Sequence, residues 1–268
     1  MLYCIHMNSW SQNRKRLILT LLILAVGILV GLPVYFLLRT TPTCSDGARD
    51  GDETGVDCGG SCQRLCPVES LPLLVQGDPR VLLVATSTYE VVALVDNPNT
   101  DAEIERARYS LKLYVPGSAV PMKTIGGEVY VPKGAEFALF AGPYAAEAGS
   151  LPTRATLEWD KSSLIWEKNT SPVSELEVGE KLFSRLDTSP RLTVSVSNLS
   201  LNVAQNVDLT ALLYDASGNI FAASKTFVEQ IPGGGETGAI FTWPSKFSSE
   251  AVQIKVIATI LPGATILR

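Results

Sequence analysis

Residues 213–219 read Leu213-Tyr214-Asp215-Ala216-Ser217-Gly218-Asn219. An amphipathic strand ends at the Leu-Tyr pair, and the polar run after it is typical of a hairpin turn in which glycine takes positive φ. Similar short apolar segments, bounded by Asn, Pro, Gly and Asp, recur at Val91–Val95, Tyr109–Tyr114 and Leu192–Val196. Such segments predict strands. Because no long segment of helical period follows residue 38, the sequence predicts a mainly β fold.

The same stretch belongs to an internal repeat with an offset of 100 or 101 residues. The matching positions are Asn97 and Asn198, Leu113-Tyr114 and Leu213-Tyr214, Gly117 and Gly218, Pro132 and Pro232, Phe140 and Phe241, and Pro143 and Pro244. A repeat of about 100 residues is the size of one immunoglobulin-like sandwich. We therefore expect two tandem Ig-like β-sandwiches, at residues 72–160 and 181–268, joined by a linker at 161–180. One strand of each repeat ends at Asn, a residue that tolerates a left-handed turn.

The second repeat also resembles known families. Leu213-Tyr214-Asp215, together with Asn198, resembles the FxLYD and CARDB-like families of bacterial Ig-like domains over about 75 residues. The first repeat departs from that pattern, because Val115 stands where Asp215 stands. The resemblance implies an Ig-like fold and a cell-surface interaction or spacer module.

A long apolar run lies near the N-terminus. Residues 17–38 read LILTLLILAVGILVGLPVYFLL, without a charge. At about 1.5 Å per residue this run can cross a hydrocarbon core of roughly 30 Å, and Pro33 is tolerated in such a helix. Arg14, Lys15 and Arg16 precede it, whereas only Arg39 follows directly. The positive-inside rule then predicts that residues 1–16 are a cytoplasmic tail and that the rest lies outside.

Two alternatives to an uncleaved anchor are a cleaved signal peptide and a lipoprotein. A signal peptide has a shorter apolar core and a small-x-small cleavage site, which residues 37–40 do not offer. Residues 41–43, before Cys44, lack the apolar and small residues of a lipoprotein signal. The sequence therefore favours a signal-anchor that crosses the cell membrane once.

Next comes a cysteine-rich segment, residues 40–67, which we call the collar. It contains Cys44, Cys58, Cys62 and Cys66, and no cysteine follows it. Outside the cytoplasm an even, clustered set predicts two disulfides, with three pairings possible. A four-cysteine zinc site is the alternative, but the spacing is not that of a familiar zinc knuckle.

Residues 46–62 read DGARDGDETGVDCGGSC. This string is similar to a short cysteine-rich motif of bacterial surface and secreted proteins, and it is most specific in DETGVDCGG. The resemblance implies an extracytoplasmic setting and no particular chemistry.

The collar is also acidic. Carboxylates at short spacings among glycines, as calcium prefers, occur at Asp46, Asp50, Asp52 and Asp57. The match to an EF-hand is poor, because no Glu occupies the twelfth position. The alternative is a solvated loop that uses Asp and Gly for turns. Calcium is the only cofactor that the sequence suggests.

Charge and residue content exclude several classes of function. Four of the 22 basic residues lie in residues 1–39, which leaves 18 basic against 27 acidic residues in the remainder. A net charge of −9 there argues against nucleic-acid partners. The only histidine is His6, so the expected ectodomain has no Ser-His-Asp or Cys-His arrangement. Residues 232–235, Pro-Gly-Gly-Gly, are expected to form a turn rather than a phosphate loop.

The expected function is therefore non-enzymatic. We expect a membrane-anchored interaction, adhesion or spacer protein with a protein or glycan partner at the cell surface. The alternative is a structural subunit of a multiprotein cell-envelope assembly.

Overall fold

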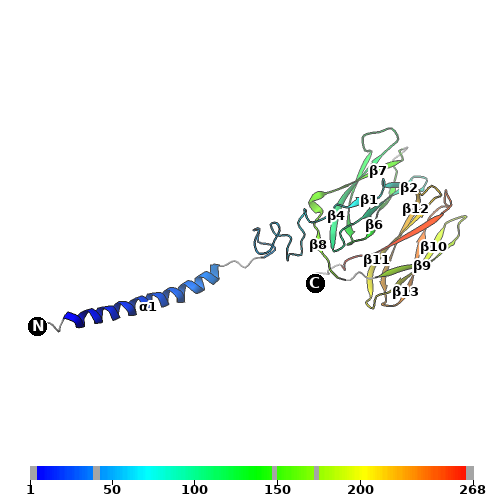
Figure 1. Cartoon of the computed structure of the whole chain (residues 1–268). Helices are drawn as coiled ribbons and strands as arrows, with labels where there is room; N and C mark the ends of the chain where they lie inside the picture. The colour runs from blue at the N-terminus through cyan, green and yellow to red at the C-terminus, as the bar shows by residue number, and fades with distance from the viewer. Residues whose placement is uncertain (1–4, 39–42, 147–149, 172–174, 264–268) are drawn as a thin grey trace. The chain divides into compact units, whose positions relative to one another are not determined.

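The computed structural model describes residues 5–38, 43–146, 150–171 and 175–263 (Figure 1). Its one long helix is α1 (Ile5–Leu38). Within α1, the 25 residues Gln12–Phe36 are long and apolar enough to cross a membrane, and none of the segment is buried. The expected anchor is thus a helix, whereas residues 1–4 of the expected tail and Arg39 lie outside the described residues.

Almost all other regular structure is β. The elements are β1 (Leu74–Val75), β2 (Arg80–Ala85), β3 (Thr88–Asp96), β4 (Ala102–Tyr114), β5 (Lys123–Val131), β6 (Glu136–Ala145), β7 (Arg154–Trp159), the 3₁₀ turn η1 (Lys161–Ser163), β8 (Glu167–Lys168), β9 (Leu176–Ser184), β10 (Arg191–Asn198), β11 (Ala204–Tyr214), β12 (Ile220–Ile231), β13 (Glu236–Thr242) and β14 (Gln253–Ile260). The mainly β prediction is confirmed.

The strands form two sandwiches of two antiparallel sheets each. In the first sandwich, the sheet β2-β3-β6 with β1 faces the sheet β5-β4-β7 with β8. In the second, β9-β10-β13 faces β12-β11-β14. Both sandwiches have the same strand order, since β2, β3 and β6 correspond to β9, β10 and β13. Leu113 and Leu213, one repeat apart, are fully buried in their respective cores.

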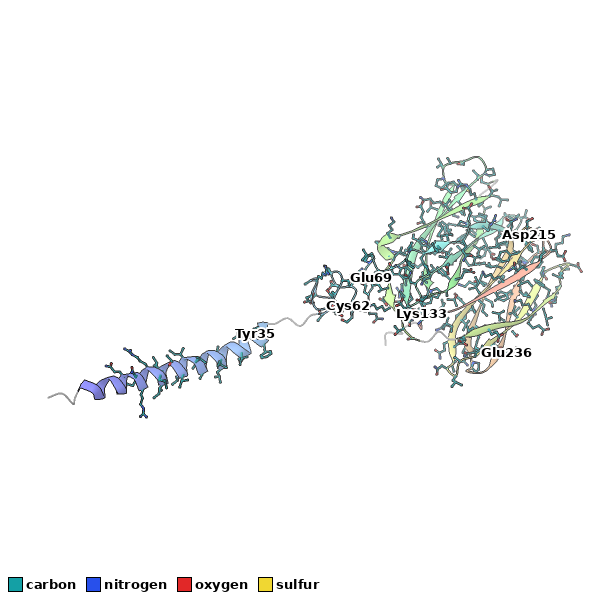
Figure 2. All side chains as sticks on the ribbon, in the orientation of Figure 1. Tyr35, Cys62, Glu69, Lys133, Asp215 and Glu236 are labelled. Carbon is teal, nitrogen blue, oxygen red and sulfur yellow. A yellow bond between two sulfur atoms is a disulfide. The ribbon has the colours of Figure 1, made fainter. Side chains whose placement is uncertain are left out.

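The hairpin at residues 215–219 forms as expected, between β11 and β12. The Asp215 N–H donates to the Asn219 carbonyl at 3.0 Å, and Gly218 has φ +75°. The Asp215 carboxylate accepts the N–H groups of Ser217 and Asn219, both at 2.9 Å. Figure 2 shows that Asp215 and Glu236 lie at opposite ends of the second sandwich.

The repeated asparagines act through their side chains. Asn97 and Asn198 are each 1% exposed. The Asn97 amide donates to the carbonyls of Ala102 and Pro132, both at 2.8 Å. The Asn198 amide donates to those of Asn202, at 2.8 Å, and Ile231, at 3.1 Å. Each side chain thus ties a strand end to two other chain segments.

Neither Asn97 nor Asn198 takes the left-handed backbone that asparagine tolerates. Among the described residues other than glycine, positive φ occurs at Asp57, Arg185 and Asn206. Asn97 and Asn198 instead satisfy buried carbonyls that a folded chain must pair.

The two sandwiches are packed against each other rather than merely strung in tandem. The sheet β2-β3-β6 meets the sheet β12-β11-β14 through an apolar cluster that we call the junction: Leu82, Val92, Leu94, Leu212, Ala223 and Ile257. Val92 and Leu212 are 0% exposed. At its margin, Lys255 forms an ion pair with Glu136 at 2.5 Å. The four sheets are therefore stacked in a row within one compact unit that begins at Cys58. In Figure 1 the labels β4, β6, β12 and β10 each mark a strand of a different sheet.

Phe140 and Phe241 are not structural counterparts, although they match in the sequence repeat. Phe241 pairs with Leu192 and is buried in the core of the second sandwich. In the first sandwich, Val91 stands where Leu192 stands in the second, and its partner on the neighbouring strand is Ala141. Phe140 lies one residue earlier and therefore faces the junction.

Part of the expected linker packs onto the first sandwich. Trp166 is 5% exposed in its core, and β8 pairs with the start of β4. Residues 59–66 of the collar, which we call the strap, lie along this segment. The Leu65 N–H donates to the Trp166 carbonyl at 2.9 Å, and the Lys168 N–H donates to the Gln63 carbonyl at 2.8 Å. Residues 172–174 of the expected linker lie outside the described residues.

The side-chain role of the repeated asparagines can be tested at Asn198. Replacing Asn198→Ala leaves two carbonyls without their donor, so we expect the free energy of unfolding to fall by about 2–4 kcal/mol. Urea unfolding of the full chain in detergent micelles measures it. Asn202→Ala, at an exposed position of the same loop, should change stability by less than about 0.5 kcal/mol. Equal effects would contradict the role.

The junction makes a second prediction. Leu212→Ala opens a cavity between the sandwiches, so we expect a loss of about 2–5 kcal/mol. Unfolding should remain a single transition, since the two sandwiches share this core. The control is Leu182→Ala on β9, where the side chain is 56% exposed. Two separate transitions in the wild-type protein would show that the sandwiches unfold independently.

Candidate functional site

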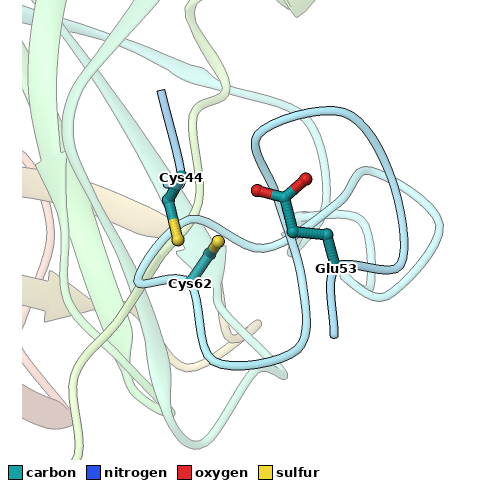
Figure 3. A group of neighbouring side chains, drawn as sticks. All are labelled: Cys44, Glu53 and Cys62. Carbon is teal, nitrogen blue, oxygen red and sulfur yellow. The ribbon is translucent and has the colours of Figure 1, made fainter. Parts of the chain in front are cut away.

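The four collar cysteines are all oxidised. Cys58 and Cys66 are bonded to each other, with their Cα atoms 5.0 Å apart. Cys44 and Cys62 are disulfide-bonded as well. The expected disulfide set is therefore present. Figure 3 shows Cys44 and Cys62 with Glu53; because these sulfurs are in disulfides, they offer no thiolate to a metal ion.

The collar carboxylates mostly organise their own loop. The Asp46 carboxylate accepts the N–H of Ala48 at 2.9 Å, and this bond lowers its pKa. Both oxygens of Asp57 accept the N–H of Gly47, at 3.0 and 3.1 Å. Asp52 is exposed. These contacts fit the turn-forming interpretation, and a calcium ion at the four aspartates stays a prediction.

Asp50 differs from its neighbours. One of its carboxylate oxygens is buried and accepts no hydrogen bond from the described residues. Desolvation, together with the charges of Asp46 and Asp57, raises its pKa. The whole side chain is only partly buried, so this acidic group is not a built metal site.

A groove lies at one end of the junction. One wall is β2, from Leu82 to Ala85, and the other is the start of β12 with the segment Trp243–Ser248 that follows β13. Its volume is about 560 Å³. The Ser245 hydroxyl donates to the Val84 carbonyl at 3.2 Å and so connects the two walls.

Aromatic side chains of the second sandwich form the apolar part of the groove. The rings of Trp243 and Phe247 are 5.1 Å apart, and those of Phe221 and Phe247 are 5.7 Å apart. The Trp243 indole N–H donates to the Ala223 carbonyl at 2.8 Å, which fixes the ring. The wall is therefore preorganised by packing within its own sandwich.

The groove contains one carboxylate, that of Glu90 on β3. It points to the junction side, like Val92, and it also borders a second hollow next to Gly142 and Pro143. A Cβ atom on Gly142 would lie 3.1 Å from Glu90 Cγ, so glycine permits this close approach. Desolvation raises the pKa of the Glu90 carboxyl to about 7.

No cation in the described part of the chain is paired with Glu90. Across the described residues, its carboxylate makes no hydrogen bond or ion pair. Lys246 lines the groove, and Lys225 lines the second hollow, but Lys225 is paired with Asp208 at 2.7 Å. A half-buried carboxylate beside aromatic rings can therefore bind a cationic group or be protonated near neutral pH.

The sequence argument missed this groove. Glu90 lies in an apolar strand with no motif around it, and the junction that buries it joins strands far apart in the chain. The available signal was the unbroken apolar run Val91–Val95, since a strand buried on both faces lacks alternation.

Comparisons with known proteins give no family. No family model matches the chain, and no curated protein matches it. A red sea bream transglutaminase structure is similar at 12% identity and a TM-score of 0.20, over 69% of this chain and 31% of that one. The structure of a β-glucuronidase from glycoside hydrolase family 2 is similar at 14% identity and a TM-score of 0.22, over 82% of this chain and 27% of that one. The chain thus spans less than a third of either protein, and neither similarity bears on its function.

The position of Glu90 predicts a pH dependence. Because its pKa is raised from 4.5 to about 7, its contribution to stability is complete below about pH 4.5 and is lost as the pH rises through 7. Glu90→Gln removes this loss, so the variant should be about 1 kcal/mol more stable than the wild type at pH 8, a value reduced for solvent screening.

The advantage of Glu90→Gln should disappear at pH 5. Urea unfolding at pH 5, 6, 7 and 8 measures it. Glu105→Gln is the control, because the Glu105 side chain is 64% exposed. A stability difference that does not grow with pH would contradict the burial argument.

Proposed function

We propose that this chain is a single-pass membrane protein that presents its two sandwiches outside the cytoplasm as one non-enzymatic interaction or spacer module. The observation that carries the proposal is the combination, in one chain, of an exposed apolar helix with a disulfide-bonded collar. A helix of this length and composition supports a membrane span, and disulfides favour an oxidising compartment.

The charges around α1 support the orientation. Arg14, Lys15 and Arg16 lie before its apolar segment, and such clusters remain on the cytoplasmic side. The collar and the sandwiches then lie on the opposite side. Their net negative charge and their lack of histidine favour protein or glycan recognition over catalysis or nucleic-acid binding.

The junction supports the role of module. Two sandwiches that share a buried apolar surface hold their loops and edges in fixed relative positions. An anchored protein of this kind gains effective concentration at the surface, so weak contacts suffice for binding.

The alternative, a structural subunit of a cell-envelope assembly, is favoured by one observation. The loop between β10 and β11 exposes three apolar side chains: Leu199 is 55%, Leu201 96% and Val203 52% exposed. Clustered apolar exposure of this kind marks contact sites for other proteins.

The orientation gives the first test. In spheroplasts of the native cells, external protease should destroy an epitope placed after Arg268 and spare one placed before Met1. Replacing Arg14, Lys15 and Arg16 by Glu should increase the fraction of inverted chains, because the charge bias is lost. Arg154→Glu, in the first sandwich, is the control. Protection of the C-terminal epitope in the wild-type protein would overturn the proposal.

Partner capture separates the two candidate functions. The full chain is crosslinked in its native cells, and its partners are compared with those of a chimera in which an unrelated apolar helix replaces residues 17–38. Unchanged capture supports an anchored interaction module. Loss of capture, with the chimera still in the membrane, supports the assembly subunit.

A further inference from the structure

The groove at the end of the junction has the properties of a peptide site. Its first wall, β2, is the last strand of its sheet, because it pairs with β3 on one side only. Apart from the Val84 carbonyl, which accepts the Ser245 hydroxyl, an edge strand of this kind presents backbone groups to which an extended chain can add. After Arg80, β2 contains no charged residue to oppose such pairing.

The second wall provides apolar contacts beside that edge. Phe221 and Phe247 are partly exposed in the groove, and Leu83 on β2 is 60% exposed. Alternate side chains of an added strand point to one face, so every second residue would lie on the face of Phe221 and Phe247. The residues between them would lie on the face of Leu83, which is opposite to that of the junction residue Leu82. An apolar or β-branched residue fits the side of Phe221 and Phe247.

Charge identifies the remaining contact. Glu90 is desolvated and has no cation partner among the described residues, and the chain after residue 39 has a net charge of −9. Lys246 also lines the groove and Arg80 begins β2, but neither forms an ion pair with Glu90. A guanidinium group is planar and weakly hydrated, and it pairs with a carboxylate through two hydrogen bonds. It would compensate the burial of Glu90 better than water does.

We propose that this groove binds an extended segment of a partner protein, in which an arginine pairs with Glu90 and the neighbouring apolar side chains contact Phe221 and Phe247. The inference rests on the proposed interaction function and names its recognition site. No covalent step is involved. Glycan binding and pairing with a second copy of this chain are the competing uses of the groove.

The test uses the full chain in detergent micelles at pH 8. The probes are two fluorescent, capped seven-residue peptides of alternating valine and threonine, one with a central arginine and one with citrulline, its neutral isostere. Fluorescence anisotropy gives both affinities. Because hydrogen bonds between charged groups contribute about 1.5–3 kcal/mol, the arginine peptide should bind at least about tenfold more tightly.

Variants locate the contact. Glu90→Gln keeps the shape of the side chain and should reduce the preference for arginine to less than about twofold, whereas Glu105→Gln should keep it. Because Glu90→Gln is expected to be the more stable protein at this pH, a lost preference is not explained by unfolding. In wild type, the nuclear magnetic resonance signal of the Trp243 indole N–H should shift on addition of the arginine peptide.

Three results would overturn the site. They are no binding of the arginine peptide, equal binding of the two peptides, and a preference that survives Glu90→Gln. Displacement of the peptide by a cell-wall glycan fragment, or by a second copy of the chain at equal affinity, would assign the groove to those occupants instead. If peptide binding fails while the sandwiches still capture partners in cells, the groove inference is wrong and the proposed function stands.

Discussion

The buried junction between the sheets β2-β3-β6 and β12-β11-β14 is the contact on which the rest of the molecule depends. Val92 and Leu212 are completely buried there, and burial of a large apolar side chain contributes about 1.5–3 kcal/mol. The junction makes one compact unit of two sandwiches. It also creates the groove, because β2 and the segment after β13 come together only when the sheets are stacked.

The stack uses non-equivalent faces of the two repeats, an arrangement that can in principle continue with further copies. The two outer faces differ from the junction at several matched positions. Lys112 stands where Leu212 stands in the other repeat, and it pairs with Glu158 at 2.6 Å. On β10, Thr193 and Ser195 stand where Val92 and Leu94 stand in the first repeat. Lys112, Thr193 and Ser195 therefore make the middle of each outer face more polar than the junction, although Leu182 and Ile240 are exposed beside Thr193.

Much of this fold could be predicted from local sequence. The turn at residues 215–219 depends on Asp and Gly chemistry within five residues, and the repeat predicted a second domain of the same kind. The apolar run of 17–38 predicted a helix that the structure contains. Cysteine clustering predicted disulfides, but not the pairing of Cys58 with Cys66, because pairing depends on how the loop folds.

The junction, the roles of the asparagines and the groove depend on contacts between distant segments. The strand at Val91–Val95 is buried on both faces, which a single-sheet interpretation does not anticipate. Phe140 matched Phe241 in the repeat, yet one residue of slip moves a side chain to the opposite face of a strand. Glu90 could be recognised only after both walls of the groove were known, since burial alone raises its pKa.

The strap has a mechanical consequence. Because Cys58 and Cys66 are bonded to each other, the chain between them is a closed loop whose ends stay 5.0 Å apart, Cα to Cα. Cys62, inside this loop, is itself in a disulfide, and Gln63 and Leu65 form backbone hydrogen bonds with the segment around Trp166. A pull on the chain can therefore load the strap, but it cannot straighten it.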